Sequence, residues 1–251
     1  MAADRPLTYG TYLHVDELLS LQPLSGDPPE HDELLFITIH QVYELWFKQI
    51  LWELDRAVVL LGADDRARAQ HSLKRVRSVV KVLVSQLDVL ETMTPLEFAS
   101  FRVHLESGSG FQSAQFREVE SVLGLKDPAA ARRAETDATR ERLQARLDAP
   151  SLWDALLAHL GRSGHPVDPR DEAAVEDVLV ELYRHDADAA GLCESLVDLD
   201  EGLQEWRYRH VKMVERTIGA KVGTGGSDGA AYLRSTLRPA FPALWSIRSR
   251  F

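Results

Sequence analysis

Two histidines lie among apolar residues in helix-like sequence, and either could bind a metal ion. His40 follows Phe36 by four residues, and His210 follows Trp206 by the same step. A neutral imidazole is the commonest axial ligand of haem iron, and an apolar helical pocket keeps that cofactor away from water. The alternative for each is a core histidine whose ring bonds to a backbone carbonyl or a buried water, and spacing alone does not separate the two.

Other metal sites find no support in the sequence. There is no HExxH, CxxC, CxxCH or calcium-loop pattern. Cys193 is the only cysteine, and a single thiol among apolar residues is more often part of a core than a ligand.

Arg102 could bind a carboxylate, because a guanidinium offers two parallel donors to a bound acid. It follows Phe98 by four residues, so one helix face would suit a ligand that is part acid and part aromatic ring. A surface ion pair is the alternative and the commoner role of an arginine.

A glycine-rich loop spans Gly223 to Gly229, with Thr224 as a polar residue near its start. It follows a helix and lacks the patterns of dinucleotide and phosphate loops. Two interpretations stay open: a lid that closes over a ligand, with Thr224 as its polar contact, and a flexible loop that ends a helix.

Long helices must position these residues. Apolar residues recur at steps of three, four or seven over 33–61, 67–91 and 171–218, with a break in the last near 186–191. A Thr94–Glu97 capping box with Pro95 starts a short helix to about 105, and another covers 112–123. No strand pattern stands out, so we expect an all-α bundle of long buried helices without significant sheet. We expect a single domain over 1–251, in which 126–184 is a peripheral, variable helical excursion.

The composition excludes several classes of function. The 251 residues carry a net charge of -10, which disfavours nucleic acid as a partner because phosphate binding needs clustered Lys and Arg. No apolar run is long enough to span a membrane. One cysteine and a start without an apolar signal segment predict a cytoplasmic protein.

Four segments together resemble the tryptophan 2,3-dioxygenase family. They occur in that family's order and read TYGTYLHVDELL, HDELLFITIHQVYELWFKQILWEL, PLEFASFRVHLESGSGFQSAQFRE and WRYRHVKMVERTIGAKVGTGGSDG. The resemblance covers most of the chain and is weakest over about 126–184. It implies a haem b enzyme that cleaves the indole C2–C3 bond of L-tryptophan with O2 to give N-formylkynurenine, in tryptophan catabolism through the kynurenine pathway.

The resemblance also implies a role for each matching residue. His210 would be the proximal iron ligand, and His40 the distal residue that accepts a hydrogen bond from the indole N–H. The other implied contacts are substrate-binding Phe36, Phe98, Arg102 and Thr224, and haem-lining Ser109 and Gly110.

The family's N-terminal segment crosses to a neighbouring subunit. The resemblance therefore implies a homo-oligomer, similar to the family's tetramers, in which Tyr9 and Leu13 complete the partner's pocket.

Two departures from the family pattern keep other functions open. Phe98 stands where some bacterial members have tyrosine, and Asp228 lies where a small neutral residue is common. The first rival is a related haem oxygenase that inserts one oxygen atom into a modified tryptophan or another aromatic amino acid. The second is a non-catalytic helical haem carrier or sensor, against which Arg102 and the Thr224 loop argue.

Overall fold

Helices make up all the regular secondary structure that the computed structural model describes, namely in residues 7–105, 112–219, 221 and 230–251. The predicted all-α fold is confirmed. Within the described residues, no helix combines the length and the apolar character needed to cross a membrane.

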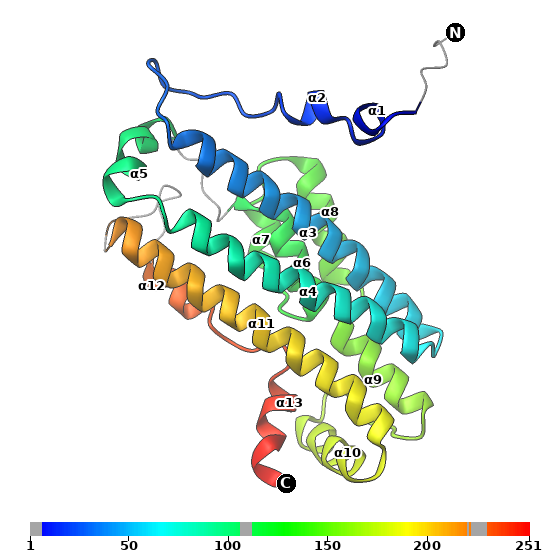
Figure 1. Ribbon diagram of the computed structural model, residues 1–251. Helices are drawn as coiled ribbons and strands as arrows, with labels where there is room; N and C mark the ends of the chain where they lie inside the picture. Colours follow the sequence, from blue (N-terminus) through cyan, green and yellow to red (C-terminus); the bar gives the residue numbers. More distant parts are fainter. Residues whose placement is uncertain (1–6, 106–111, 220, 222–229) are drawn as a thin grey trace.

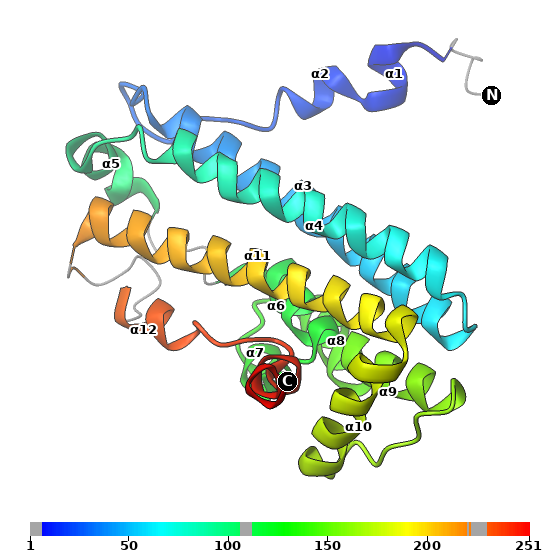
Figure 2. The same ribbon diagram turned by 60° about the horizontal axis from the view of Figure 1, so that its bottom comes forward.

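Three long helices run side by side through the molecule: α3 (Glu33–Gly62), α4 (Arg66–Leu90) and α11 (Ala187–Ile218) (Figures 1 and 2). The middle helix, α4, packs against both others. Their facing sides are apolar, and Leu54, Leu73 and Leu192 are fully buried there. The helical period read from the sequence is therefore the period of the core.

Local capping signals set several helix ends. The predicted capping box is present at the start of α5 (Pro95–Phe101), where Thr94 and Glu97 each bond the other's backbone N–H. A short 3-10 helix, η1 (Arg102–Leu105), follows it. The predicted break in the last long helical region is also confirmed, because Asp186 separates α10 (Glu172–His185) from α11 and caps α11 through Ala189 N–H.

A second layer covers α3 on the side away from the N-terminal segment. It contains α6 (Ala114–Leu123), α7 (Pro128–Arg132), α8 (Asp137–Asp148) and α9 (Leu152–Arg162). Part of this layer falls in the segment that the sequence led us to expect at the periphery, but α9 packs directly on α3. Its residues Leu152, Leu156 and Leu160 are fully buried, so this helix contributes to the core.

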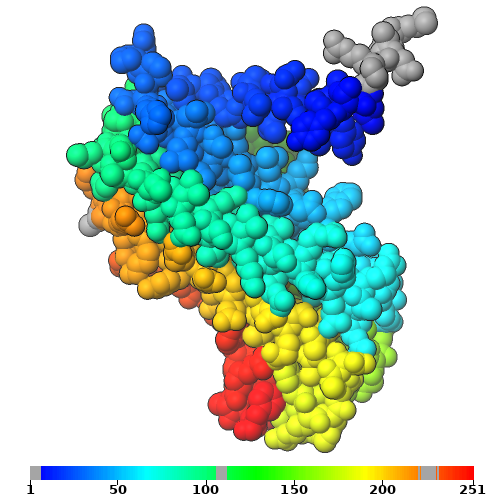
Figure 3. Space-filling model, viewed as in Figure 1, coloured from blue at the N-terminus to red at the C-terminus, as the bar shows by residue number. Residues whose placement is uncertain are grey.

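The two ends of the described chain differ in how they contact the bundle. At the N-terminus, α1 (Tyr9–Leu13) and α2 (Val15–Leu18) form an arm that projects beyond the body (Figure 3). At the C-terminus, α12 (Ala230–Ser235), α13 (Pro242–Ser246) and η3 (Ile247–Arg250) fold back on the bundle. Buried Asp200 of α11 anchors this return by accepting hydrogen bonds from the backbone N–H groups of Ala240 and Phe241.

Candidate active site

A cavity of about 500 Å³ lies at the end of the bundle where α11 finishes and α5 begins. Its walls come from α3, α4, α5, α6, α11 and α12, and most of the lining is apolar or aromatic. A volume in this range and a mainly apolar lining are typical of sites for small molecules and organic cofactors.

His40 and His210 both line this cavity, His40 from α3 and His210 from α11. The His40 ring packs on Phe36, with 4.1 Å between the ring centroids. The His210 ring stacks on Trp206 at 5.6 Å with an interplanar angle of 6°. The fold thus brings together in one cavity two histidines that are far apart in sequence.

The hydrogen bond of His40 defines which of its nitrogens can act as an acceptor. Its Nδ1 lies 2.7 Å from the carbonyl oxygen of Phe36, one helical turn earlier. A carbonyl can only accept, so Nδ1 carries the proton. Desolvation lowers the pKa of His40, although the Phe36 bond and the charge of Glu44 act in the other direction. The ring is therefore neutral at pH 7, and Nε2 is left as an acceptor.

His210 is suited to bind a metal. Part of its surface stays accessible because it borders the cavity, but the surrounding protein desolvates the ring. This desolvation, together with the nearby His40, lowers the pKa of His210 to about 4. Within the described residues its ring makes no hydrogen bond to another group, so a neutral nitrogen with a lone pair faces an apolar cavity large enough for a planar cofactor.

Arg102 lies at another part of the same cavity wall, beside Phe98. Its guanidinium carbon is 6.0 Å from the centre of the Phe98 ring. Phe98 also packs on Phe36, with 5.8 Å between centroids, and both rings contact Phe101. One cation beside a group of aromatic rings can recognise a ligand that carries both a carboxylate and an aromatic ring.

The other residues singled out in the sequence are either outside the described part of the chain or in the N-terminal arm. Ser109, Gly110, Thr224 and Asp228 lie outside the described residues. Tyr9 and Leu13 belong to the N-terminal arm, and they are 79% and 45% exposed. The structure of one chain leaves their proposed contact with a partner subunit as a prediction.

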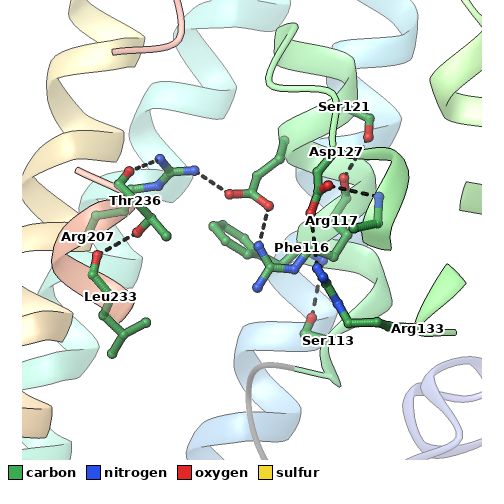
Figure 4. Close-up of polar contacts among 11 residues, drawn as sticks. Ser113, Phe116, Arg117, Ser121, Asp127, Arg133, Arg207, Leu233 and Thr236 are labelled. Carbon is green, nitrogen blue, oxygen red and sulfur yellow. Dashed lines mark hydrogen bonds and ion pairs between the residues drawn. The ribbon is translucent and has the colours of Figure 1, made fainter. Parts of the chain in front are cut away.

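Sequence reasoning missed a charged group in the cavity wall. Glu120 of α6 bridges two arginines, Arg117 on its own helix and Arg207 on α11 (Figure 4). A readable signal did exist for Arg207, which lies four residues from both Leu203 and Val211. Those two residues are buried, so the arginine stands on an inward stripe of the helix.

The chain is similar in sequence to known proteins of the family that its motifs resemble. The family model for tryptophan 2,3-dioxygenase matches residues 2–165 and 134–251. A protein named tryptophan 2,3-dioxygenase from Herpetosiphon aurantiacus is 55% identical and aligns over 97% of this chain and 98% of its own length. Proteins of the same name from Anaeromyxobacter sp. and Caulobacter vibrioides are 54% and 45% identical, covering 96% and 100% of this chain and 95% and 100% of their own.

Proposed function

Because the chain belongs to the tryptophan 2,3-dioxygenase family, we propose that it uses haem and O2 to cleave the indole C2–C3 bond of L-tryptophan, giving N-formylkynurenine. The chain is an enzyme of this type. The observation that carries the detailed proposal is that His40, His210 and Arg102 share the wall of one apolar cavity.

The residues in the cavity fit haem. His210 supplies a neutral imidazole, and the apolar lining would keep the macrocycle away from water. His210 would therefore hold the iron, with Ser109 and Gly110 lining the pocket as the family resemblance implies. When bound, the haem supplies the iron that activates O2, while the protein orients the substrate and excludes competing reactions.

The substrate contacts follow from the described side chains. The Nε2 atom of His40 would accept the indole N–H, because its Nδ1 is already committed to Phe36. Phe36 and Phe98 would pack against the indole, and Arg102 would bind the substrate carboxylate. The family resemblance adds Thr224, outside the described residues, as a contact of the ammonium and carboxylate groups. Holding the ring and the acid end together fixes the C2–C3 bond in one orientation, which is the main task of the protein.

The overall reaction balances without another reductant. Both atoms of O2 enter the product, the C2–C3 bond breaks, and the electrons that reduce O2 come from the indole ring. His40 orients the substrate in this scheme and is not an essential base.

We extend the proposal to the assembly and the location of the enzyme. The exposed side chains of the N-terminal arm, Tyr9 and Leu13 among them, support a homo-oligomer in which the arm reaches a partner subunit, with a tetramer as the expected state. A cytoplasmic location belongs to the same proposal and rests on the single cysteine, which cannot form an internal disulfide.

One experiment tests the proposed reaction. The protein is purified with haem, reduced, and given L-tryptophan in air, and the product is followed by absorbance and mass. We expect a Soret band and a product heavier than tryptophan by two oxygen atoms, whereas gain of one atom would favour the rival oxygenase.

Two variants complete this test. His210→Ala should lose haem-dependent activity, and His71→Ala, an exposed histidine of α4, should not. An unchanged haem spectrum and full activity in His210→Ala would contradict the assignment.

A further inference from the structure

Three charged side chains form a nearly buried group in the cavity wall. Glu120 accepts hydrogen bonds of 2.6 Å from Arg117 Nη1 at one carboxylate oxygen and from Arg207 Nη2 at the other. The side chains of Arg117, Glu120 and Arg207 are 14%, 11% and 5% exposed. Arg207 also donates to the backbone carbonyl of Thr236 at 2.6 Å, as Figure 4 shows.

In this group the single carboxylate of Glu120 accepts from two guanidinium groups. Both guanidinium carbons lie 5.7 Å from the centre of the Phe116 ring, so the two cations flank the same ring. Burial lowers the pKa of Arg207, as do the positive charges of Arg117 and Arg238, while Glu120 and Asp200 oppose the shift. A further anion beside Arg207 would relieve this repulsion.

Arg207 also has a donor left over. Its Nε is buried and has no hydrogen-bond partner, although both Nη atoms are engaged. Arg207 lines the cavity. A buried donor without an acceptor costs free energy, so Arg207 has the capacity for a further acceptor.

We propose that Arg207 and Arg117, held by Glu120, form a second carboxylate-binding subsite of the cavity, distinct from the one at Arg102. The proposal rests on the proposed function, since the ligand is what enters that cavity. Two carboxylate sources are present in that reaction, the haem propionates and the amino-acid substrate.

The position of the subsite favours the haem as the source. Arg207 lies one helical turn from His210 on α11, next to the proposed iron ligand. Arg102 instead belongs to the aromatic group of Phe36 and Phe98, on the His40 side. A cofactor with acid side chains on its rim and a substrate with one acid group would then each meet a different arginine.

The test measures haem release instead of turnover. Arg117→Gln and Arg207→Gln are loaded with haem or with haem dimethyl ester, which lacks the charged carboxylates, and transfer to apomyoglobin is timed. Arg209→Gln serves as the control, because this neighbouring arginine pairs with Asp88 at the surface. Circular dichroism and melting temperature check folding, and Arg117→Gln keeps the test valid if Arg207→Gln fails to fold, since Arg207 also holds Thr236.

We expect the variants to release haem about tenfold faster than the wild type does, which is the fold-change of one lost charge-assisted hydrogen bond. The variants should release the ester at the same rate as the wild type does. Unchanged haem release with a tenfold higher KM for L-tryptophan, but not for tryptamine, would support the subsite and assign it to the substrate.

Equal acceleration for haem and its ester, or no change in either measurement, would overturn the subsite while the proposed function stands. A wild-type protein that takes up no haem would contradict both.

Discussion

At the scale of single residues, His40 and His210 are suited to different tasks although both are neutral and border the same cavity. His40 commits one nitrogen to the Phe36 carbonyl, which fixes its tautomer and leaves the other nitrogen as an acceptor. His210 instead stacks on Trp206 and is strongly desolvated, which lowers its pKa to about 4. Their surroundings, more than their residue type, support the proposal that His40 contacts the substrate and His210 the metal.

The neutral state of His40 predicts a pH dependence of substrate binding. Because desolvation lowers its pKa below 6.5, the acceptor form should persist through neutral pH and disappear only as the pH falls through the lowered pKa. We expect the KM for L-tryptophan to be flat near pH 7 and to rise in acid. His40→Ala should keep haem, raise KM about threefold to tenfold, the value of one neutral hydrogen bond, and lose this acid limb.

Steady-state kinetics of the wild type and His40→Ala between pH 5 and 8 would check this. The same acid limb in both proteins would show that another group titrates.

Arg102 gives a second prediction for the residue scale, on specificity. If its guanidinium binds the substrate carboxylate, Arg102→Gln should raise KM for L-tryptophan by about tenfold to a hundredfold, as expected for a lost charge-assisted hydrogen bond. Tryptamine, which lacks the carboxylate, should be a poor substrate for the wild type and equally poor for the variant. A variant that lost both substrates in proportion would indicate that Arg102 maintains structure, not specificity.

The sequence predicted some of these site residues and not others for a physical reason. His40, His210 and Arg102 were candidates because each lies in an apolar or aromatic helical pattern. That pattern left a core histidine or a surface ion pair open, and only the family resemblance implied their roles. Arg117 and Glu120 are ordinary charged residues in a polar stretch. Their importance arises when α6 packs near α11 and buries them with Arg207. That contact joins residues 87 positions apart, and local pattern does not encode it.

At the scale of elements, the signals that succeeded are local. The start of α5 and the break before α11 depend on caps within three residues, so the sequence predicted them. The end of α5 was expected at about residue 105, but the α-helix ends at Phe101 and continues as the 3-10 helix η1. The place of α9 depends on which neighbour its apolar stripe meets, and Leu152, Leu156 and Leu160 meet α3. The charged residues that flank α9 in the sequence led us to expect this helix at the periphery. Its packing on α3 instead makes it part of the core.

The C-terminal return offers an element-scale prediction. Asp200 is buried and accepts from the backbone of Ala240 and Phe241, and from Trp245 Nε1 at 2.9 Å. Asp200→Ala would leave these donors without a buried acceptor. We expect a loss of about 2 to 4 kcal/mol in the free energy of unfolding, measured by urea denaturation.

The matched control for Asp200 is two residues away on the same helix. Asp198→Ala removes a half-exposed carboxylate that pairs with Arg77, so it should cost less than about 1 kcal/mol. Similar losses for both variants would mean that the carboxylate of Asp200 does not anchor the C-terminal segment.

At the scale of the whole molecule, the architecture was predictable because three long helices with clear apolar periods dominate it. The structure of the N-terminal arm was harder to predict from the sequence. Its helices have only a few residues each, and its apolar side chains stay exposed on the single chain. Local sequence cannot say what covers them, since that depends on another surface; the proposed oligomer would supply one.

A seven-residue repeat on the outer face of α3 leads to a prediction about that assembly. Leu45, Trp52 and Val59 are 51%, 71% and 70% exposed, and steps of seven keep them on one side of the helix. An exposed apolar stripe of this kind marks a protein interface. We expect the wild type to be an oligomer, and Trp52→Glu to shift it to smaller species with unchanged helix content, because a charge would be buried between subunits.

Light scattering after size exclusion, with circular dichroism alongside, measures both properties of the Trp52 variant. Gln144→Glu, which adds the same charge at an exposed position of α8, should keep the wild-type mass. A wild type with the mass of one chain would contradict the oligomer. A Trp52→Glu protein with the wild-type mass would show that the oligomer forms through a different surface. A glutamate buried at the centre of an apolar contact cannot be accommodated without loss of affinity.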